Sequence, residues 1–478
     1  MVQFISLIFS NVLSKPGFFC GIIVFIGLLL LKKPVYEALC GFIKTAVGYF
    51  ILTVGSDGLS NTFRPIMNAL GSRFGIQASL VDTYFLMGQM YGEGGLFSVA
   101  GAAAYMLFGQ LIAMITNMIL VALNKWTRCR VIYTTGHTLG MYTSVFMWLV
   151  FMIAPATQNP VSALLIGVLG GVWASVGSNM TVEATQNLTG NAGFAIGHQC
   201  MWGVWFYDKI AGKLGDPKDS IENVKMPGFL SIFKDNVVST AVLMTVFIGG
   251  MMLVTGRSAL AAVDPSLNQS TLFGVYIVTK CLYFSVYMYI LLAGVRMFVA
   301  ELTKAFEGIS RKLIKGSMPG VDIAVSFNYA HPNVTMVGFV CGFVGQVIAI
   351  AGLLLFKSPL FLLPGFIPLF FDNAAVAVYA NKRGGKRAAV ICSVFNGIFQ
   401  VLVSLGMILF VQSCCGTLLT AWPGFFDNNS YLVAFLFAYR FLPPMVAFVV
   451  LTVALLGVNQ LYYRCNKEHY YSYMEDME

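Results

Sequence analysis

Residues 333–356 read NVTMVGFVCGFVGQVIAIAGLLLF, a run without a single charged side chain. A bilayer core of about 30 Å needs about 20 residues of α-helix, so this run is long enough to cross it. Similar runs recur along a chain of 478 residues, of which 58% are hydrophobic and only 10% are charged. An ordinary soluble domain has about 25% charged residues. The composition therefore excludes a soluble globular protein and a disordered chain, and predicts an all-α polytopic membrane protein.

Apolar runs separated by charges and by Pro/Gly clusters predict about eleven transmembrane helices. The runs cover residues 16–31, 40–58, 96–123, 132–154, 160–180, 236–255, 272–296, 333–356, 359–380, 388–412 and 431–457. Pro364 and Pro368 interrupt the ninth run. Three other segments are too polar to span, and we expect amphipathic helices there that lead into re-entrant, partly inserted stretches: 59–95, 184–212 and 297–330. The first run lacks a basic flank and a cleavage site, which predicts an uncleaved span.

The distribution of Lys and Arg predicts the orientation of the chain. With the N-terminus outside and alternating spans, 20 basic residues fall in inside segments and six in outside segments. Cytoplasmic loops of membrane proteins carry the excess of basic residues, so we expect the N-terminus outside and the C-terminus in the cytoplasm. These loops explain the net charge of +9. No basic stripe with interleaved aromatic residues occurs, which argues against nucleic-acid binding.

Two segments share one pattern and suggest an internal repeat. GSRFGIQASLVDTYF (71–85) and SRKLIKGSMPGVDIAVSF (310–327) each place a basic amphipathic helix before Gly and a Val-Asp pair. They follow the second and seventh runs, which would cross the membrane in opposite directions. Such a pattern is typical of transporters built from inverted repeats. We expect one membrane domain over 1–478, with inverted halves roughly at 16–235 and 236–412 and an extra helix at 431–457.

Polar groups at membrane depth are costly and therefore mark cavities or pathways. His137 lies near the start of the fourth run, His198-Gln199 lie in GFAIGHQ, and Asp322 follows Met-Pro-Gly. A lone His in a helix is more often structural, whereas the glycines around His198 weaken a regular helix there. Asp82 is equally a ligand or a helix cap. Neutral donors and acceptors with one carboxylate suit a polyhydroxylated ligand. Cys/His metal spacing and a Walker A motif are missing from the sequence, so we expect neither metal nor cofactor.

Several stretches resemble the ascorbate-type EIIC permeases of the bacterial phosphoenolpyruvate-dependent sugar phosphotransferase system (PTS). They are KTAVGYFILTVGSDGLSNTFRP (44–65), TGNAGFAIGHQ (189–199), KMPGFLSIFKDNVVSTA (225–241), GVRMFVAELTKAFEGISRKLIKGSMPGVD (294–322) and LPGFIPLFFDNA (363–374). The resemblance implies eleven spans in an inverted repeat. It also implies a homodimer in which a core domain moves like an elevator against a V-shaped dimerisation domain.

The resemblance further implies transport of L-ascorbate, or a similar sugar acid or polyol, across the bacterial inner membrane. The solute would be phosphorylated by a separate phospho-EIIB, itself charged by EIIA, so the permease is a transport component and not an enzyme by itself. Asp322 would be the base for phosphoryl transfer. The family's substrate-binding positions fall on Gly55, Ser56, Thr83, Tyr84, His137, His198, Gln199, Asp322, Pro364, Gly365 and Phe366.

One departure and two alternatives stay open. Met141 stands where the family pattern has Gln, and 86–100 diverges, so the preference for L-ascorbate can have shifted to another polyol or sugar acid. A proton-coupled secondary transporter would use Asp322 and a histidine as a proton relay. A membrane receptor would bind the solute without accumulating it. For an EIIC permease, the basic loops 301–316 and 382–387 would face the anionic phospho-EIIB.

Overall fold

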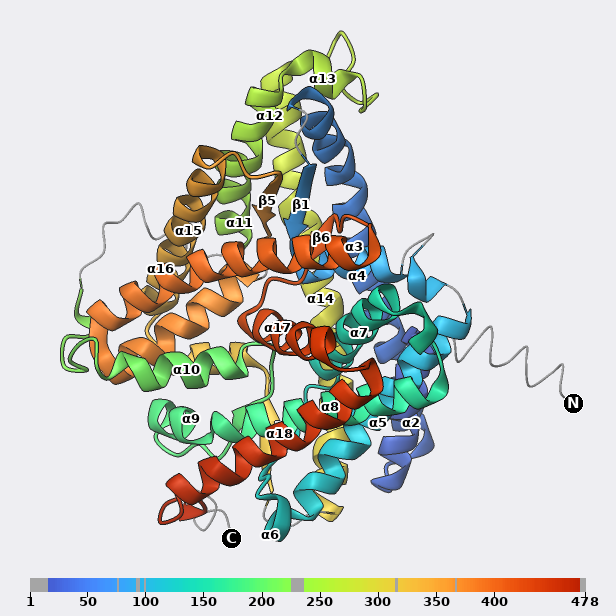
Figure 1. Ribbon diagram of the computed structural model, residues 1–478, viewed down its shortest axis with the longest axis vertical. Coiled ribbons are helices and arrows are strands. Elements are labelled where there is room, and N and C mark those ends of the chain that lie inside the picture. The colour runs from blue at the N-terminus through green and yellow to red at the C-terminus, as the bar shows by residue number, and fades with distance from the viewer. Residues whose placement is uncertain are drawn as a thin grey trace, which may run out of the picture.

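The computed structural model describes residues 16–74, 77–91, 95–98, 100–224, 236–313, 317–365 and 368–472, and it is mostly helical (Figure 1). The longer helices are α2 (Pro16–Leu30), α3 (Val35–Phe74), α5 (Ala100–Ala122), α7 (Gly136–Ile153), α8 (Pro160–Met180), α14 (Phe273–Leu313), α15 (Pro332–Leu355), α16 (Asn373–Cys415), α17 (Phe426–Phe441) and α18 (Pro444–Cys465). The shorter ones are α4 (Thr83–Tyr91), α6 (Asn124–Thr127), α9 (Val182–Thr189), α10 (Met201–Ala211), α11 (Asn236–Met244), α12 (Gly250–Thr255) and α13 (Arg257–Ala261).

Short 3₁₀ and π segments join these helices. The 3₁₀ segments are η2 (Leu96–Ser98), η3 (Pro155–Thr157), η4 (Ile221–Asn223) and η7 (Ile323–Tyr329). The π segments are η6 (Thr245–Gly249) and η8 (Pro368–Asp372). Irregular turns of this kind often occur at functional sites, and η7 and η8 both follow a short strand.

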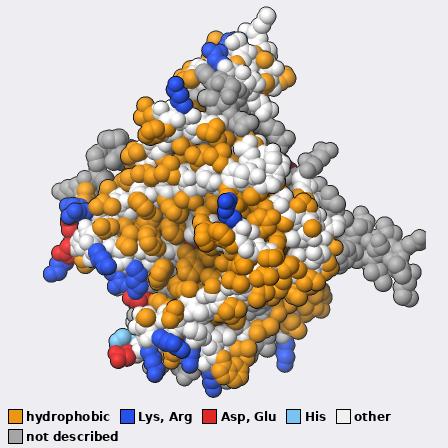
Figure 2. Space-filling view, in the orientation of Figure 1, with side chains coloured by type: hydrophobic (Ala, Val, Ile, Leu, Met, Phe, Trp, Pro, Cys, Tyr) orange, Lys and Arg blue, Asp and Glu red, His pale blue; other side chains and the backbone are white. Residues whose placement is uncertain are grey.

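Long apolar helices confirm a multi-pass membrane protein. In the described residues, six stretches are long and apolar enough to cross a membrane: Val35–Gly55, Ala104–Ala122, Pro160–Met180, Pro332–Leu355, Pro368–Cys415 and Pro444–Cys465. Hydrophobic side chains cover much of the face in Figure 2, while Lys and Arg lie mainly along its left and lower edges. Large apolar side chains such as Leu355 and Phe437 are exposed, as lipid-facing residues would be. The full count of eleven spans stays a prediction.

Two of the predicted spans are interrupted in the structure where proline occurs. The run 359–380 does not begin as a helix, because Leu360–Pro364 form a strand and η8 follows before α16 starts. The run 431–457 is divided between α17 and α18, which are separated at Leu442-Pro443. Proline has no backbone N–H and its ring clashes with the preceding turn, so it ends a helix or starts the next one.

Six short strands form two parallel sheets that the sequence analysis did not foresee. Sheet A has the order β5-β1-β6, and sheet B has the order β2-β4-β3. The strands are β1 (Gln77–Val81), β2 (Val131–Tyr133), β3 (Ala195–Ile196), β4 (Met318–Val321), β5 (Leu360–Pro364) and β6 (Ala421–Trp422). All four pairings are parallel.

The two sheets exchange strands between the first and second parts of the chain. Strand β1 lies at the centre of sheet A, between β5 and β6 from the second part. Strand β4 lies at the centre of sheet B, between β2 and β3 from the first part. The segments 71–85 and 310–327, which share one sequence pattern, therefore hold the same position in their two sheets.

Close glycine packing joins α15 to α16, and we predict that Gly345→Ala destabilises this contact. A Cβ added at Gly345 would lie 2.1 Å from the carbonyl oxygen of Val394. Backbone cannot yield as a side chain can, and overpacking costs about 1–3 kcal/mol. We expect a lower melting temperature of the detergent-solubilised protein. Gly352→Ala on the same helix is the matched control, because its Cβ would meet nothing within 4 Å. Equal melting temperatures for the two variants would contradict the packing described.

Candidate functional site

Sheet B brings three of the predicted motifs to one edge. The carboxyl ends of parallel strands meet at the same edge of a sheet, and here that edge is continued by Thr134, Gly197 and Asp322. The amide of Thr134 donates to Gly320 O (3.0 Å), and the amide of Gly197 donates to Val321 O (2.8 Å). A Cβ at Gly197 would lie 2.9 Å from Gly320 O, so glycine permits this close approach.

Sheet A arranges the other motifs in the same way. Asp82 and Thr83 follow β1, Gly365 follows β5, and Pro423 follows β6. The Thr83 hydroxyl donates to Pro423 O (2.8 Å), and the Gly365 amide donates to Val81 O (2.9 Å). A Cβ at Gly365 would lie 2.3 Å from atoms of the Asp82 side chain. The two predicted motifs VDTY (81–84) and LPGF (363–366) are therefore in direct contact.

The chain that follows β6 reaches across to the edge of sheet B. The rings of Phe425 and His198 are 5.6 Å apart between centroids and stand edge to face. The amide of Asp427 donates to Gln199 O (3.3 Å). Asp427 Oδ1 accepts from the amides of Trp202 (2.9 Å) and Gly203 (3.2 Å) at the start of α10. The carboxyl edges of the two sheets thus face one another across residues 425–427.

Three predicted residues at sheet B carry most of the chemistry. His198 is 8% exposed, and its Nδ1 lies 3.6 Å from the sulfur of Cys200. Gln199 is 1% exposed, and neither atom of its side-chain amide has a partner among the described residues. Asp322 Oδ1 accepts from the amide of Ala324 (2.9 Å) and caps η7, and its carboxylate is close enough to His198 for their charges to interact. A buried neutral amide beside an imidazole and a carboxylate can bind several hydroxyl groups.

Asp82 caps a helix, which is one of the two roles predicted for it. Asp82 Oδ1 accepts from the amide of Phe85 (3.1 Å) in the first turn of α4. Asp322 caps η7 from the equivalent position after β4. The aspartates of the two Val-Asp pairs therefore both cap the helical segment that follows them. Asp322 is in addition close to His198.

The remaining predicted residues are placed in part. Pro364 ends β5 and is buried, and Gly55 is buried within α3, a helix that packs against β1 and α4. Ser56, Tyr84 and His137 lie in α3, α4 and α7, but their side chains are outside the described part of the structure. Phe366 lies outside the described residues. Met141, which replaces the family's Gln, is buried in the hydrophobic core.

Phe-Phe-Asp-Asn occurs twice in the chain, at 370–373 and 425–428, and this repeat is a signal that was not used to predict the site. Asp372 Oδ2 accepts from the amide of Phe426 (3.1 Å) and from the side chains of Asn396 (3.2 Å) and Gln400 (2.8 Å). Asp372 therefore ties the start of α16 to the start of α17. Asp427 in the second copy ties α17 to the loop that carries His198.

Loop 382–387, predicted to be a docking surface, lies at a kink of α16, and one of its basic residues has an internal role. Arg383 donates to the carboxylates of Asp208 (2.9 Å) and Glu183 (3.0 Å), and Glu183 also accepts from Lys209 (2.7 Å). Asp208 is buried, and a buried carboxylate needs such a partner. Arg383 therefore links α16 to α9 and α10 through these ion pairs.

The other basic residues of this loop face outward. Lys382, Lys386 and Arg387 are exposed, and Lys386 makes an exposed ion pair with Asp219 (2.9 Å). In the second predicted loop, Lys304 is exposed and pairs with Glu301 (2.9 Å). The Lys386–Asp219 pair is exposed on both sides and contributes little to stability, whereas Glu301 in the other pair is buried.

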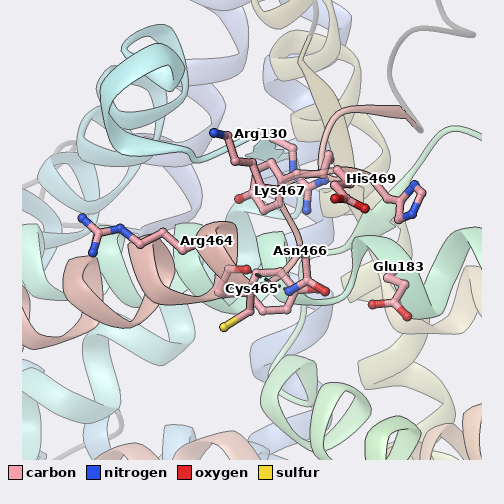
Figure 3. Close-up of a pocket in the computed structure, with 10 residues that line it drawn as sticks. Arg130, Glu183, Arg464, Cys465, Asn466, Lys467 and His469 are labelled. Carbon is pink, nitrogen blue, oxygen red and sulfur yellow. Dashed lines mark hydrogen bonds between the residues drawn. The ribbon is translucent and has the colours of Figure 1, made fainter.

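A separate cavity of about 600 Å³ lies at the opposite edge of sheet B, between the C-terminal segment and Arg130 (Figure 3). The guanidinium of Arg130, just before β2, stacks over the ring of Tyr470 at 3.7 Å, and its Nε donates to Asn179 Oδ1 (2.9 Å). Arg128 lies over Tyr463 at 4.3 Å. These contacts anchor the tail beside Arg130. Nowhere in the described residues do three or more His, Cys, Asp or Glu gather as a metal would require.

Together, the long apolar helices and the facing polar edges define a multi-pass helical membrane protein with buried polar groups inside it. The family model of the PTS system sugar-specific permease component, EIIC-GAT, matches residues 11–425. The chain therefore belongs to this family of sugar permeases. It is also similar to the ascorbate-specific PTS system EIIC component of Mycoplasma pneumoniae (strain ATCC 29342 / M129 / Subtype 1), with 30% identity over 429 residues. The match covers 82% of this chain and 65% of that relative.

Proposed function

We propose that this permease binds and translocates L-ascorbate, or a similar sugar acid or polyol, and that uptake is coupled to phosphorylation by a separate phospho-EIIB. The observation that carries the proposal is the meeting of His198, Gln199 and Asp322 at one sheet edge, opposite the edge formed by the VDTY and LPGF motifs. The similarity to an ascorbate-specific relative supports this solute class. The buried donors and acceptors suit hydroxyl groups.

In this mechanism the solute lies between the two sheet edges. His198 and Gln199 bind its hydroxyl groups, and Asp322 accepts the proton of the hydroxyl that receives the phosphoryl group. Phosphoryl transfer depends mainly on positioning and charge stabilisation. The permease supplies that positioning, while EIIB, charged by EIIA, supplies the phosphoryl group. The permease itself is then a transport component, not an enzyme.

We place the chain in the bacterial inner membrane with the N-terminus outside and the C-terminus in the cytoplasm. Basic segments assigned to the cytoplasm touch one another in the structure: Arg128 and Arg130 contact the tail, and Arg383 contacts the α9–α10 region. The strand exchange supports two inverted halves with equivalent central strands. The paired long helices α3 and α14 suit a V-shaped dimerisation domain of a homodimer, against which the core would move as an elevator.

The test uses right-side-out vesicles, labelled L-ascorbate, and purified phospho-EIIA and EIIB loaded inside. We expect accumulation of phosphorylated product that requires EIIB and survives an uncoupler. The alternative of a proton-coupled transporter rests on the proximity of His198 to Asp322. It predicts unphosphorylated solute inside, uptake without EIIB, and collapse with the uncoupler. Binding without accumulation would instead indicate a receptor.

We predict that reversing the charge of exposed basic residues in loop 382–387, here called the kink loop, slows the association with EIIB. In Lys382→Glu/Arg387→Glu, the rate of EIIB-dependent phosphorylation should fall roughly 10-fold at low salt, because charge complementarity mainly sets association rates. Binding of solute should not change. Lys357→Glu, an exposed basic residue on the predicted outer side, is the matched control. The same loss in both variants would argue against a docking role for the kink loop.

A further inference from the structure

Buried polar atoms without partners concentrate beside the candidate site. Fourteen buried side-chain nitrogen and oxygen atoms in the described residues have no hydrogen-bond partner, and five of them belong to Gln199, Asp427 and Asn428. All three residues are at most 1% exposed. Native proteins leave few such groups, and each one calls for an explanation. The concentration of these groups at a single place suggests that a ligand completes their hydrogen bonds.

The structure holds Asp427 in a fixed orientation. One carboxylate oxygen, Oδ1, accepts from two amides at the start of α10, while the backbone amide of Asp427 donates to Gln199 O. The other oxygen, Oδ2, has no partner in the described part of the chain. Asp427 therefore presents one oriented oxygen without a partner, and its backbone contacts Gln199.

The first copy of Phe-Phe-Asp-Asn shows what a purely structural asparagine looks like in this fold. Asn373 donates to Leu369 O (2.9 Å) and to Gln400 Oε1 (3.1 Å), and its own oxygen accepts from Asn396 (3.0 Å). Asn428 holds the same position in the second copy and is equally buried, yet neither its oxygen nor its nitrogen has a partner among the residues described. The two asparagines thus differ in their hydrogen bonds, whereas Asp372 of the first copy, like Asp427, has one carboxyl oxygen without a partner among the described residues.

We propose that Asp427 and Asn428, at the start of α17, bind hydroxyl groups of the transported solute beside Gln199. The inference rests on the proposed function and adds two substrate-binding residues that follow the predicted second half, 236–412. Asp427 accepts a hydrogen bond from a hydroxyl, and Asn428 both donates and accepts. Both side chains therefore suit the hydroxylated part of the solute.

The first test is Asn428→Leu, which keeps the volume of the side chain and removes both unpartnered groups. We expect the KM for labelled L-ascorbate in EIIB-dependent uptake to rise at least about 10-fold, since a site built for hydrogen bonds discriminates strongly when they are lost. The melting temperature should stay equal or rise, because buried polar groups without partners disappear. Asn373→Leu is the matched control, and it should lower the melting temperature because three hydrogen bonds are lost.

A second variant covers the case in which Asn428→Leu does not fold. Asp427→Asn keeps an oxygen for the two amides of α10 but replaces the free acceptor with a donor, so the KM should again rise with little change in melting temperature. Wild-type KM in whichever variant folds would overturn the inference while leaving the proposed function intact. If the unmodified protein takes up neither L-ascorbate nor sorbitol in an EIIB-dependent manner, it is the proposed function that fails.

Discussion

Asp322→Asn should lower EIIB-dependent uptake of L-ascorbate at least about 100-fold, the effect typical of losing a positioned acid or base. Asparagine caps a helix as well as aspartate does, so the hydrogen bond from the amide of Ala324 is retained. What the substitution removes is the negative charge beside His198. The measurement is uptake in vesicles that contain phospho-EIIB, with melting temperature as the measure of folding.

Comparing uptake with binding shows what Asp322 does. Retained binding with lost phosphorylation would make the carboxylate a base, whereas equal loss of both would make it a ligand only. Asp322→Ala is a useful companion, since it removes the cap as well and should also lower the melting temperature by an amount typical of a lost cap, about 1 kcal/mol in the free energy of unfolding. Uptake by Asp322→Asn close to that of the unmodified protein would rule out both roles.

Gly365→Ala should have the second large effect, because it moves the two motifs of sheet A apart. The new Cβ would lie 2.3 Å from the Cβ and Oδ2 of Asp82. Asp82 is buried and caps α4, so it cannot swing away without losing its hydrogen bond to the amide of Phe85. A displacement of about 1 Å in a binding site costs roughly 100-fold in rate. We expect that loss in uptake, measured as kcat/KM.

The control for this substitution is Gly406→Ala in α16, where a Cβ would meet nothing within 4 Å. That variant should transport normally and melt at the same temperature or slightly higher, because alanine favours a helix. If Gly365→Ala and Gly406→Ala transport equally well, the contact between the LPGF and VDTY motifs has no role in uptake.

The long helices could be predicted from the sequence because hydrophobic length is a local property. The run 160–180 coincides with α8, and 333–356 differs from α15 by one residue at each end. The strands could not be predicted, since each has only two to five residues. Their partners are also distant in the chain, as in the pairing of Leu80 with Ala421. Pairing over such distances leaves no periodic signal.

The candidate site could likewise be predicted from the sequence only in part. His198, Gln199 and Asp322 could be predicted because glycine or proline beside a polar group marks irregular backbone at membrane depth. Asp427 and Asn428 were missed because they follow two phenylalanines and begin an ordinary helix. Asp427 meets Gln199 through a hydrogen bond between residues distant in the chain. The repeated Phe-Phe-Asp-Asn was the available signal, and it acquires meaning only when the hydrogen bonds of its two copies are compared.

The exchange of strands has a consequence for how the chain is made. During synthesis β1 enters the bilayer before β5 and β6 have been made. Its backbone amides and carbonyls therefore have no strand partners during most of translation. Strands β2 and β3 likewise have no partner until β4 has been made. Neither half can mature by itself, and two half-chains produced separately would have to assemble with each other before either became resistant to proteases.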